Sequence, residues 1–185
     1  MPTREKILHL TNELIQTKGY NGFSYADISK EIGFNKASIH YHFKSKSVLG
    51  IAYCSYKKQA FQELEQLIIK EKNGLERLKL YINAFKLCAL KGQTCGAFSM
   101  IINKPSFDGE LQDAVSKLAE LELKIISDIL HYGIESGDIK ANGISIGNLA
   151  IIVNSAVKGA LTLNNIPNSD AFDKVSDALI ILLKK

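Results

Sequence analysis

Cysteine and proline are both scarce in this chain of 185 residues, which contains three of each. Cys54, Cys88 and Cys95 form no CxxC pair, and three thiols cannot all pair with one another. This pattern argues against a disulfide scaffold as the basis of the fold. The prolines stand near plausible ends of secondary-structure elements, so none interrupts a predicted helix.

Membrane and leader signals are also missing. No apolar run approaches the roughly 20 residues that a membrane span needs. The first residues, "MPTREKILHL", carry charges where a signal peptide would have its apolar core. We therefore expect a cytoplasmic protein without a membrane partner.

Enzyme and cofactor motifs are absent as well. The sequence has no GxGxxG, P-loop, HExxH or GxSxG motif. His40 and His42 lie two positions apart, so on a helix they point to different sides and do not favour a shared metal. The sequence therefore predicts a protein that is not an enzyme and has no cofactor and no metal.

Charge is present but unevenly distributed. Residues 1–46 contain seven Lys and Arg and four acids, a net charge of +3, out of +4 for the whole chain. Such a concentration of positive charge suggests a segment that faces a polyanion. A solvated basic surface is the simpler alternative.

Helical patterns run through nearly the whole chain, and we expect an all-α fold of about nine helices. Thr3 is expected to cap the first helix, whose apolar face carries Ile7, Thr11, Leu14 and Ile15. The helix after Ser24 is expected to bury Ala26, Ile28 and Ile32. Another helix is expected to run unbroken from Leu75 to about Leu90.

A helix-turn-helix is predicted between Ser24 and Phe43. Ser24 can cap a short helix with Asp27 at its third position, and Gly33 ends that helix. The tight turn "GFN" leads directly into a second short helix, "KASIHYHF". Two short helices joined by a Gly-containing turn are typical of this motif.

The stretch "FSYADISKEIGFNKASIHYHFKSKSVL" resembles the DNA-binding domain of the tetracycline-repressor (TetR) family of transcription regulators. The resemblance implies a three-helix DNA-binding domain at residues 1–46 and a helical effector-binding and dimerisation domain at residues 47–185. It also implies a homodimeric repressor that a small hydrophobic effector releases from a double-stranded DNA operator. Asn35 and His40 depart from the residues common in the family, so base preference could differ there.

The second helix of this motif is expected to read DNA. Its first residues would meet base edges in the major groove, and neighbouring polar groups would contact phosphates. Lys36 would read guanine, and Lys46 would contact a phosphate. The predicted DNA-binding residues are Ser24, Tyr25, Asn35, Lys36, Ala37, Ser38, His40, Tyr41, His42 and Lys46.

An effector cavity is expected among the later helices, mostly apolar with a few polar groups. Its predicted lining is Leu78, Ile82, Phe85, Cys88, Cys95, Phe98, Ile101, Leu121, Ile125, Asn154 and Lys158. Lys158 has a second interpretation, as an edge residue whose ammonium reaches solvent. Cys95 lies in "GQTCGAFSMI", which resembles a family branch with a Cys-Gly at this place; it is either a packing residue or a sensor thiol.

The last two predicted helices are apolar over more surface than one small bundle buries. They form either the core of a monomer or a self-complementary dimer face. The predicted interface residues are Ile152, Val175, Leu179 and Leu183. Three alternatives to a ligand-released repressor remain: a redox or electrophile sensor that uses Cys95, a helical ligand-binding protein that does not act on DNA, and an activator or protein-binding regulator.

Overall fold

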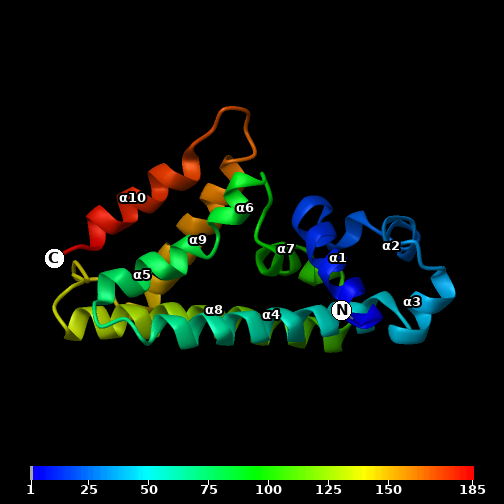
Figure 1. The fold of residues 1–185 in the computed structure, drawn as a ribbon. Helices are drawn as coiled ribbons and strands as arrows, with labels where there is room; N and C mark the ends of the chain where they lie inside the picture. Colours follow the sequence, from blue (N-terminus) through cyan, green and yellow to red (C-terminus); the bar gives the residue numbers. More distant parts are fainter. Residues whose placement is uncertain (1) are drawn as a thin grey trace. The chain divides into compact units, whose positions relative to one another are not determined.

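The computed structural model describes residues 2–185 and contains α-helices throughout this range (Figure 1). The helices are α1 Thr3–Lys18, α2 Tyr25–Ile32, α3 Lys36–His42, α4 Lys46–Ile68, α5 Gly74–Asn83, α6 Lys86–Leu90, α7 Gly96–Asn103, α8 Gly109–Glu135, α9 Ile146–Leu163 and α10 Ala171–Leu183. Two 3₁₀ turns, η1 Tyr20–Gly22 and η2 Lys104–Ser106, complete them. The described residues form no strand beyond one bridge between Ile139 and Lys184. The all-helical class expected from the sequence is confirmed.

The chain divides into two compact units. Unit 1 contains the residues up to Gln59 together with Gly96–Ala119. Unit 2 contains Ala60–Cys95 and Glu120–Lys185. The helices α4 and α8 each supply residues to both units. The functional boundary after residue 46 is a different kind of division and stays a prediction.

The core of unit 1 begins with α1. Ile7, Thr11, Leu14 and Ile15 are all buried, as their helical spacing predicts. The Thr11 hydroxyl donates to the Ile7 carbonyl at 2.7 Å, so its polar atom is satisfied inside the core. The capping role expected for Thr3 is wrong. Residue 2 is a proline with φ −57° and ψ 152°, and the helix begins directly after it, with Thr3 already in its first turn.

The helices α2 and α3 form the predicted helix-turn-helix. Gly33 ends α2 with φ +69°, a left-handed conformation that glycine adopts at little cost. The expected burial of Ala26 is wrong, because Ala26 is exposed. The expected burial of Ile28 is confirmed, Tyr25 one turn earlier completes the buried side of α2, and Ile32 is half-buried.

The helix expected from Leu75 to Leu90 is broken in the structure. α5 ends at Asn83 and α6 begins at Lys86. Phe85 stands at the break with φ −100° and ψ −4°, and its ring is buried at 6% exposure. The break therefore places an aromatic ring inside unit 2 at a point where the helical hydrogen-bond pattern is interrupted.

The start of α5 crosses the end of α8 at close range within unit 2. A Cβ atom added to Gly74 would lie 2.2 Å from the Cα of Gly133. Asp138 accepts hydrogen bonds from the Gly74 amide at 2.7 Å and from the Asn73 side chain at 2.8 Å. The bond from the Gly74 amide, followed by one from the Ser136 hydroxyl at 2.7 Å, holds the pKa of Asp138 below its usual value. The crossing is thus fixed by two glycines and one carboxylate.

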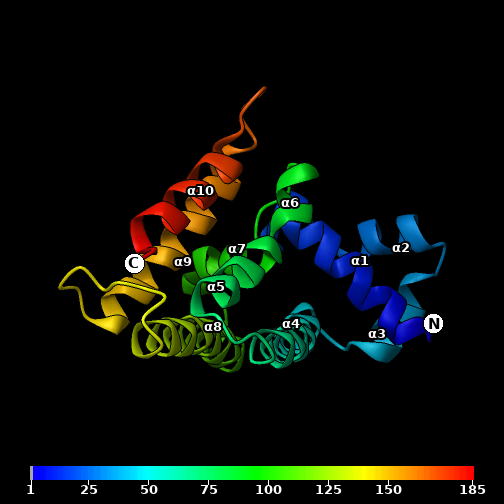
Figure 2. The same ribbon diagram turned by 60° about the vertical axis from the view of Figure 1, so that its left-hand side comes forward.

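The helices α9 and α10 lie side by side at the end of unit 2 (Figure 1, Figure 2). Leu149, Val153 and Val157 of α9 are buried. Contrary to expectation from the sequence, α9 is long and apolar enough to cross a membrane by length and composition alone. It buries 39% of this stretch within the protein, and core helices of other proteins meet the same criterion.

Candidate functional site

The helix α3 is anchored by its apolar side and presents its polar side outward. Ile39 and Phe43 are 0% and 1% exposed, respectively, so they fix the helix against unit 1. The Asn35 side chain caps the helix by accepting from the Ser38 amide at 2.8 Å. Tyr41 is 83% exposed. Because its buried side is packed against the rest of unit 1, this short helix can present its exposed side as a rigid surface.

Two grooves border α3 on either side, and together they contain all the predicted DNA-binding residues. One groove of about 380 Å³ is lined by Thr3, Phe34, Asn35, Ala37, Ser38, Tyr41 and His42. The other, of about 400 Å³, is lined by Phe23, Ser24, Tyr25, Ala26, Lys36, His40 and Lys46. The structure therefore brings the candidates together around one helix, while their contact with DNA stays a prediction.

The start of α2 borders the second groove. The Ser24 hydroxyl accepts from the Ala26 amide at 3.2 Å and donates to Asp27 at 2.7 Å. Asp27 also accepts from the Ser24 amide at 2.7 Å. These bonds, the Ser24 side chain first, lower the pKa of Asp27. The capping box predicted from the sequence is present. It fixes the first turn of α2 at the edge of the second groove.

One of the predicted DNA contacts, Tyr25, has a structural role in unit 1, and a second, His40, packs against it. Tyr25 is buried, and its hydroxyl donates to the Phe43 carbonyl at 2.9 Å, which joins α2 to the end of α3. Its hydroxyl is therefore engaged inside the protein, and we leave Tyr25 out of the proposed contacts. His40 packs against Tyr25 at 4.8 Å between ring centroids and is itself exposed.

Lys46 is half-buried and lines the second groove. Its ammonium donates to the Phe23 carbonyl and lies 4.4 Å from the Phe23 ring and 4.8 Å from the Tyr20 ring. Burial lowers its pKa, and the charge of Asp27 opposes this shift. Lys46 thus anchors the start of α4 as well as lining the groove. Lys44, which the sequence reading did not select, is exposed nearby in the chain.

The predicted effector residues are divided between the units. Phe98 and Ile101 belong to unit 1, and the others belong to unit 2. Within unit 2, the buried members are Leu78, Ile82, Phe85, Cys95, Ile125 and Lys158, while Cys88, Leu121 and Asn154 are half-buried. Ile82 also borders a groove of about 420 Å³ between α5 and α10.

A polar centre lies in the interior of unit 2. Lys158 of α9 donates to the Glu122 carboxylate of α8 at 2.6 Å, and Tyr81 of α5 donates to the same oxygen at 2.9 Å. The Lys158 and Glu122 side chains are 0% and 2% exposed. The interpretation of Lys158 as an edge residue reaching solvent is therefore wrong. Burial, followed by the charge of Glu122, raises the pKa of Tyr81 well above its usual value.

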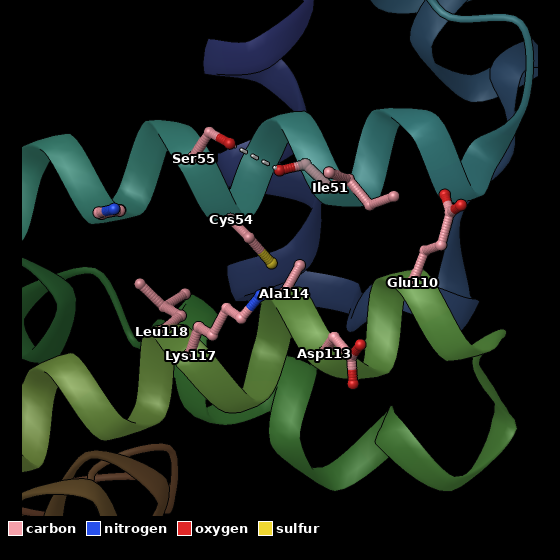
Figure 3. Close-up of a pocket in the computed structure, with 9 residues that line it drawn as sticks. Ile51, Cys54, Ser55, Glu110, Asp113, Ala114, Lys117 and Leu118 are labelled. Atoms are coloured by element: carbon pink, nitrogen blue, oxygen red, sulfur yellow. Dashed lines mark hydrogen bonds between the residues drawn. The ribbon is translucent and has the colours of Figure 1, made fainter.

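Two of the cysteines, Cys54 and Cys95, have buried side chains. Cys95 is 4% exposed, so its thiol is poorly accessible to a reagent. Cys54, also 4% exposed, points from α4 into a groove of about 450 Å³ against α8 (Figure 3). Burial raises the pKa of the Cys54 thiol to about 12, which keeps it protonated at neutral pH. These surroundings favour packing roles over a sensor role.

Comparison with known proteins agrees with this geometry. The family model described as "Bacterial regulatory proteins, tetR family" matches residues 7–52, which include α2 and α3. A TetR-family regulator from Agrobacterium tumefaciens is 28% identical with a TM-score of 0.88, covering 98% of this chain and 97% of that one. A TetR regulator from Legionella pneumophila is 26% identical with a TM-score of 0.87, covering 100% and 98%.

Residues 7–52 thus match the DNA-binding domain of TetR-family regulators, and the fold of the described chain matches theirs. A curated relative, the fatty acid metabolism regulator protein of Bacillus subtilis, is 28% identical over 141 residues. These residues represent 75% of this chain and 72% of the relative. The alternative of a helical protein unrelated to DNA regulation is set aside, because both the head sequence and the full-length fold match regulators of transcription.

The outward face of α9 and α10 differs from the predicted interface. Leu179 and Leu183 are 6% and 4% exposed and pack inside unit 2, and Val175 is half-buried. Only Ile152 of the predicted residues is exposed. The exposed apolar face instead consists of Ile151, Ile152, Ile181 and Leu182, at 53%, 47%, 73% and 61% exposure.

Sequence reasoning missed two members of the polar centre, Glu122 and Tyr81. A signal for Glu122 was available. It follows Leu118 by four positions and precedes Ile125 by three, so it shares the inner face of α8. A lysine inside an apolar helix needs an acid on a facing helix, and this spacing identifies one.

Proposed function

We propose that this TetR-family regulator is a homodimeric repressor that binds an operator through α3 and releases it when a small molecule binds unit 2. The observation that carries the proposal is the arrangement of α3, anchored by Ile39 and Phe43 and bordered by two grooves, one of which contains both Lys36 and Lys46. Recognition helices of helix-turn-helix proteins enter the major groove in this way.

The proposed DNA contacts divide into two kinds. Lys36, Ala37, Ser38 and His40 lie on or near the first turn of α3 and would meet base edges. The remaining predicted contacts, Ser24, Asn35, Tyr41, His42 and Lys46, line the flanking grooves and would hold the phosphate backbone. Residues 1–46 would therefore act as the DNA-binding domain, and residues 47–185 would bind effector and partner.

A second copy of the chain is proposed to cover the exposed face formed by Ile151, Ile152, Ile181 and Leu182. Four large apolar side chains on two adjacent helices support an interface. A two-fold dimer would also present two α3 helices to paired half-sites. The same face on both copies would meet itself, as two-fold symmetry requires.

The effector would act by favouring a state with lower affinity for the operator. A coupling of about 1–3 kcal/mol changes affinity about 5–150-fold, which is enough for a transcriptional response. We infer that the protein acts by binding rather than by catalysis and works in the cytoplasm, where its operator is. The apolar lining predicted for unit 2 suits a small hydrophobic molecule.

Two measurements test this function. Footprinting on the DNA upstream of its own coding region should reveal a protected site with two half-sites, and a reporter driven from that region should be repressed. Protection without repression would contradict the repressor assignment. No protected site at protein concentrations that saturate ordinary operators would contradict the DNA-binding proposal itself.

The dimer is tested by one exposed and one buried substitution. Ile181→Glu should give folded monomers with little operator affinity, because it places two charges in the proposed interface. Leu179→Glu is the contrasting variant and should unfold unit 2, since Leu179 is buried within the chain. A folded Ile181→Glu protein that sediments as a dimer at micromolar concentration would rule out this face.

A further inference from the structure

The Lys158–Glu122 ion pair is enclosed by apolar helices of unit 2. Its nitrogen and oxygen are 2.6 Å apart, and both side chains are excluded from solvent. Removing two charges from water is costly, and a well-packed apolar pair in their place is often as stable. Fold stability therefore gives a weak reason for the pair, and a ligand gives a better one.

The pair has a net charge of zero, and its donors are concentrated at one point. The Lys158 ammonium and the Tyr81 hydroxyl both donate to the same oxygen of Glu122. The ammonium has three N–H groups. It also lies 3.3 Å from the centre of the Phe85 ring, so this ring covers it on one side.

Phe85 is the member of this arrangement that a ligand would displace. It stands at the break between α5 and α6, where the helical pattern is already interrupted. A ring at such a position can turn away with less disturbance than one in the middle of a helix. If it moves, an N–H of Lys158 loses its aromatic partner and requires an acceptor.

Asn154 extends the polar centre toward the edge of unit 2. It precedes Lys158 by one turn of α9 and is half-buried. Its side-chain oxygen lies 3.5 Å from the Tyr81 hydroxyl. Polar groups thus continue from the enclosed pair to a residue that solvent reaches.

We propose that the effector is an uncharged molecule with an aromatic or similarly compact apolar body and a hydrogen-bond-accepting oxygen, which takes the place of the Phe85 ring and accepts from Lys158. This assignment rests on the proposed effector function of unit 2. An uncharged ligand leaves the ion pair intact and adds no buried charge. A carboxylate would be repelled by Glu122, and an ammonium would be repelled by Lys158.

Three probes of similar size and different charge test the assignment: acetophenone, benzoate and benzylamine. Binding to the DNA-free protein is measured by calorimetry. Acetophenone should bind at least about tenfold more tightly than either charged probe, because like charges in a buried site are strongly unfavourable. Phe85→Ala should strengthen acetophenone binding, because it vacates the space for a ring. Leu87→Ala, at a position 61% exposed on α6, is the matched control and should change nothing.

Changing the charge of the centre should invert the preference. Glu122→Gln leaves a positive site and should favour benzoate, and Lys158→Met leaves a negative site and should favour benzylamine. Circular dichroism identifies variants that fold. If both charge variants unfold, the double variant Lys158→Met with Glu122→Leu replaces them and should bind the three probes without the wild-type preference for acetophenone.

The outcomes separate this proposal from the proposed function. Equal binding of the three probes to the wild type, or no binding of acetophenone to both the wild type and Phe85→Ala, would overturn the assignment of the polar centre. Operator binding is measured on the same preparations. If acetophenone binds as expected and the operator is never bound, the ligand assignment stands and the repressor function fails.

Discussion

Lys46 of unit 1 is half-buried and Lys158 of unit 2 is buried, and the two ammonium groups have different partners. Lys46 in unit 1 donates to a neutral carbonyl and faces two aromatic rings, so its positive charge is not cancelled by its hydrogen-bond partner. Lys158 in unit 2 pairs with the carboxylate of Glu122, which cancels its charge. This difference is the one expected if unit 1 meets a polyanion and unit 2 encloses an uncharged ligand, as proposed above.

The largest effect is expected from breaking the neutral pair. Lys158→Ala leaves Glu122 buried without its cation and should lower the free energy of unfolding by about 3–5 kcal/mol. The double variant Lys158→Met with Glu122→Leu should recover most of this loss. Urea unfolding of the three proteins checks the expectation. A single variant as stable as the wild type would mean that water enters the centre and that the pair is not enclosed.

The next largest effect is expected from changing Lys36, whose side chain is exposed on unit 1. Lys36 is exposed at the start of α3, so Lys36→Ala should remove about 1–3 kcal/mol of preference for the operator. Affinities for the operator and for a random duplex of the same length are compared. If both fall by the same factor, Lys36 contacts phosphate and does not read a base.

A smaller effect should separate the anchored lysine from its exposed neighbour. Lys46→Ala should cost about 1 kcal/mol of stability through its bond to the Phe23 carbonyl and should also weaken all duplexes. Lys44→Ala should leave stability unchanged and reduce the salt dependence of DNA binding by about one unit of slope. Identical unfolding curves for the two variants would show that Lys46 has no anchoring role.

The smallest effect is a pH dependence that comes from burial in unit 1. The pKa of Cys54 is raised to about 12 by burial, from 9.0 in an ordinary thiol. Between these values the folded state binds more protons than the unfolded state, so stability should fall as pH rises from 9 toward 12. Cys54→Ala should show a shallower fall over this range in thermal melts. Parallel profiles would mean that the thiol ionises freely.

The sequence predicted the start and end of α2 and the buried face of α1 because these signals are local. Ser24, Asp27 and Gly33 form a cap and a stop whose geometry depends on near neighbours, and the structure has them as predicted. The helical spacing of Ile7, Thr11, Leu14 and Ile15 likewise indicated the buried face of α1. The ammonium of Lys46 donates to a carbonyl 23 positions earlier in the chain. Local sequence patterns give no sign of such a distant contact, so this anchoring role was not predicted.

Unit 2 was harder because its decisive contacts join distant residues. α10 has apolar residues on two faces, and periodicity does not say which face meets α9; Leu179 turned out inside and Ile181 outside. The pairing of Lys158 with Glu122 joins residues 36 positions apart. The break at Phe85 has no glycine or proline to indicate it, so a continuous helix was the natural expectation.

The crossing of α5 and α8 at Gly74 and Gly133 limits how this protein can vary over evolution. A methyl group at position 74 would overlap the backbone of position 133, and a methyl group at position 133 would overlap the side chain of Ile139. A homologue with a larger residue at position 74 must hold these helices farther apart, and its counterpart of Asp138 would then no longer reach the start of α5. Glycine at both positions, together with the acid at position 138, is therefore a sequence pattern by which homologues with the same helix crossing in unit 2 can be recognised.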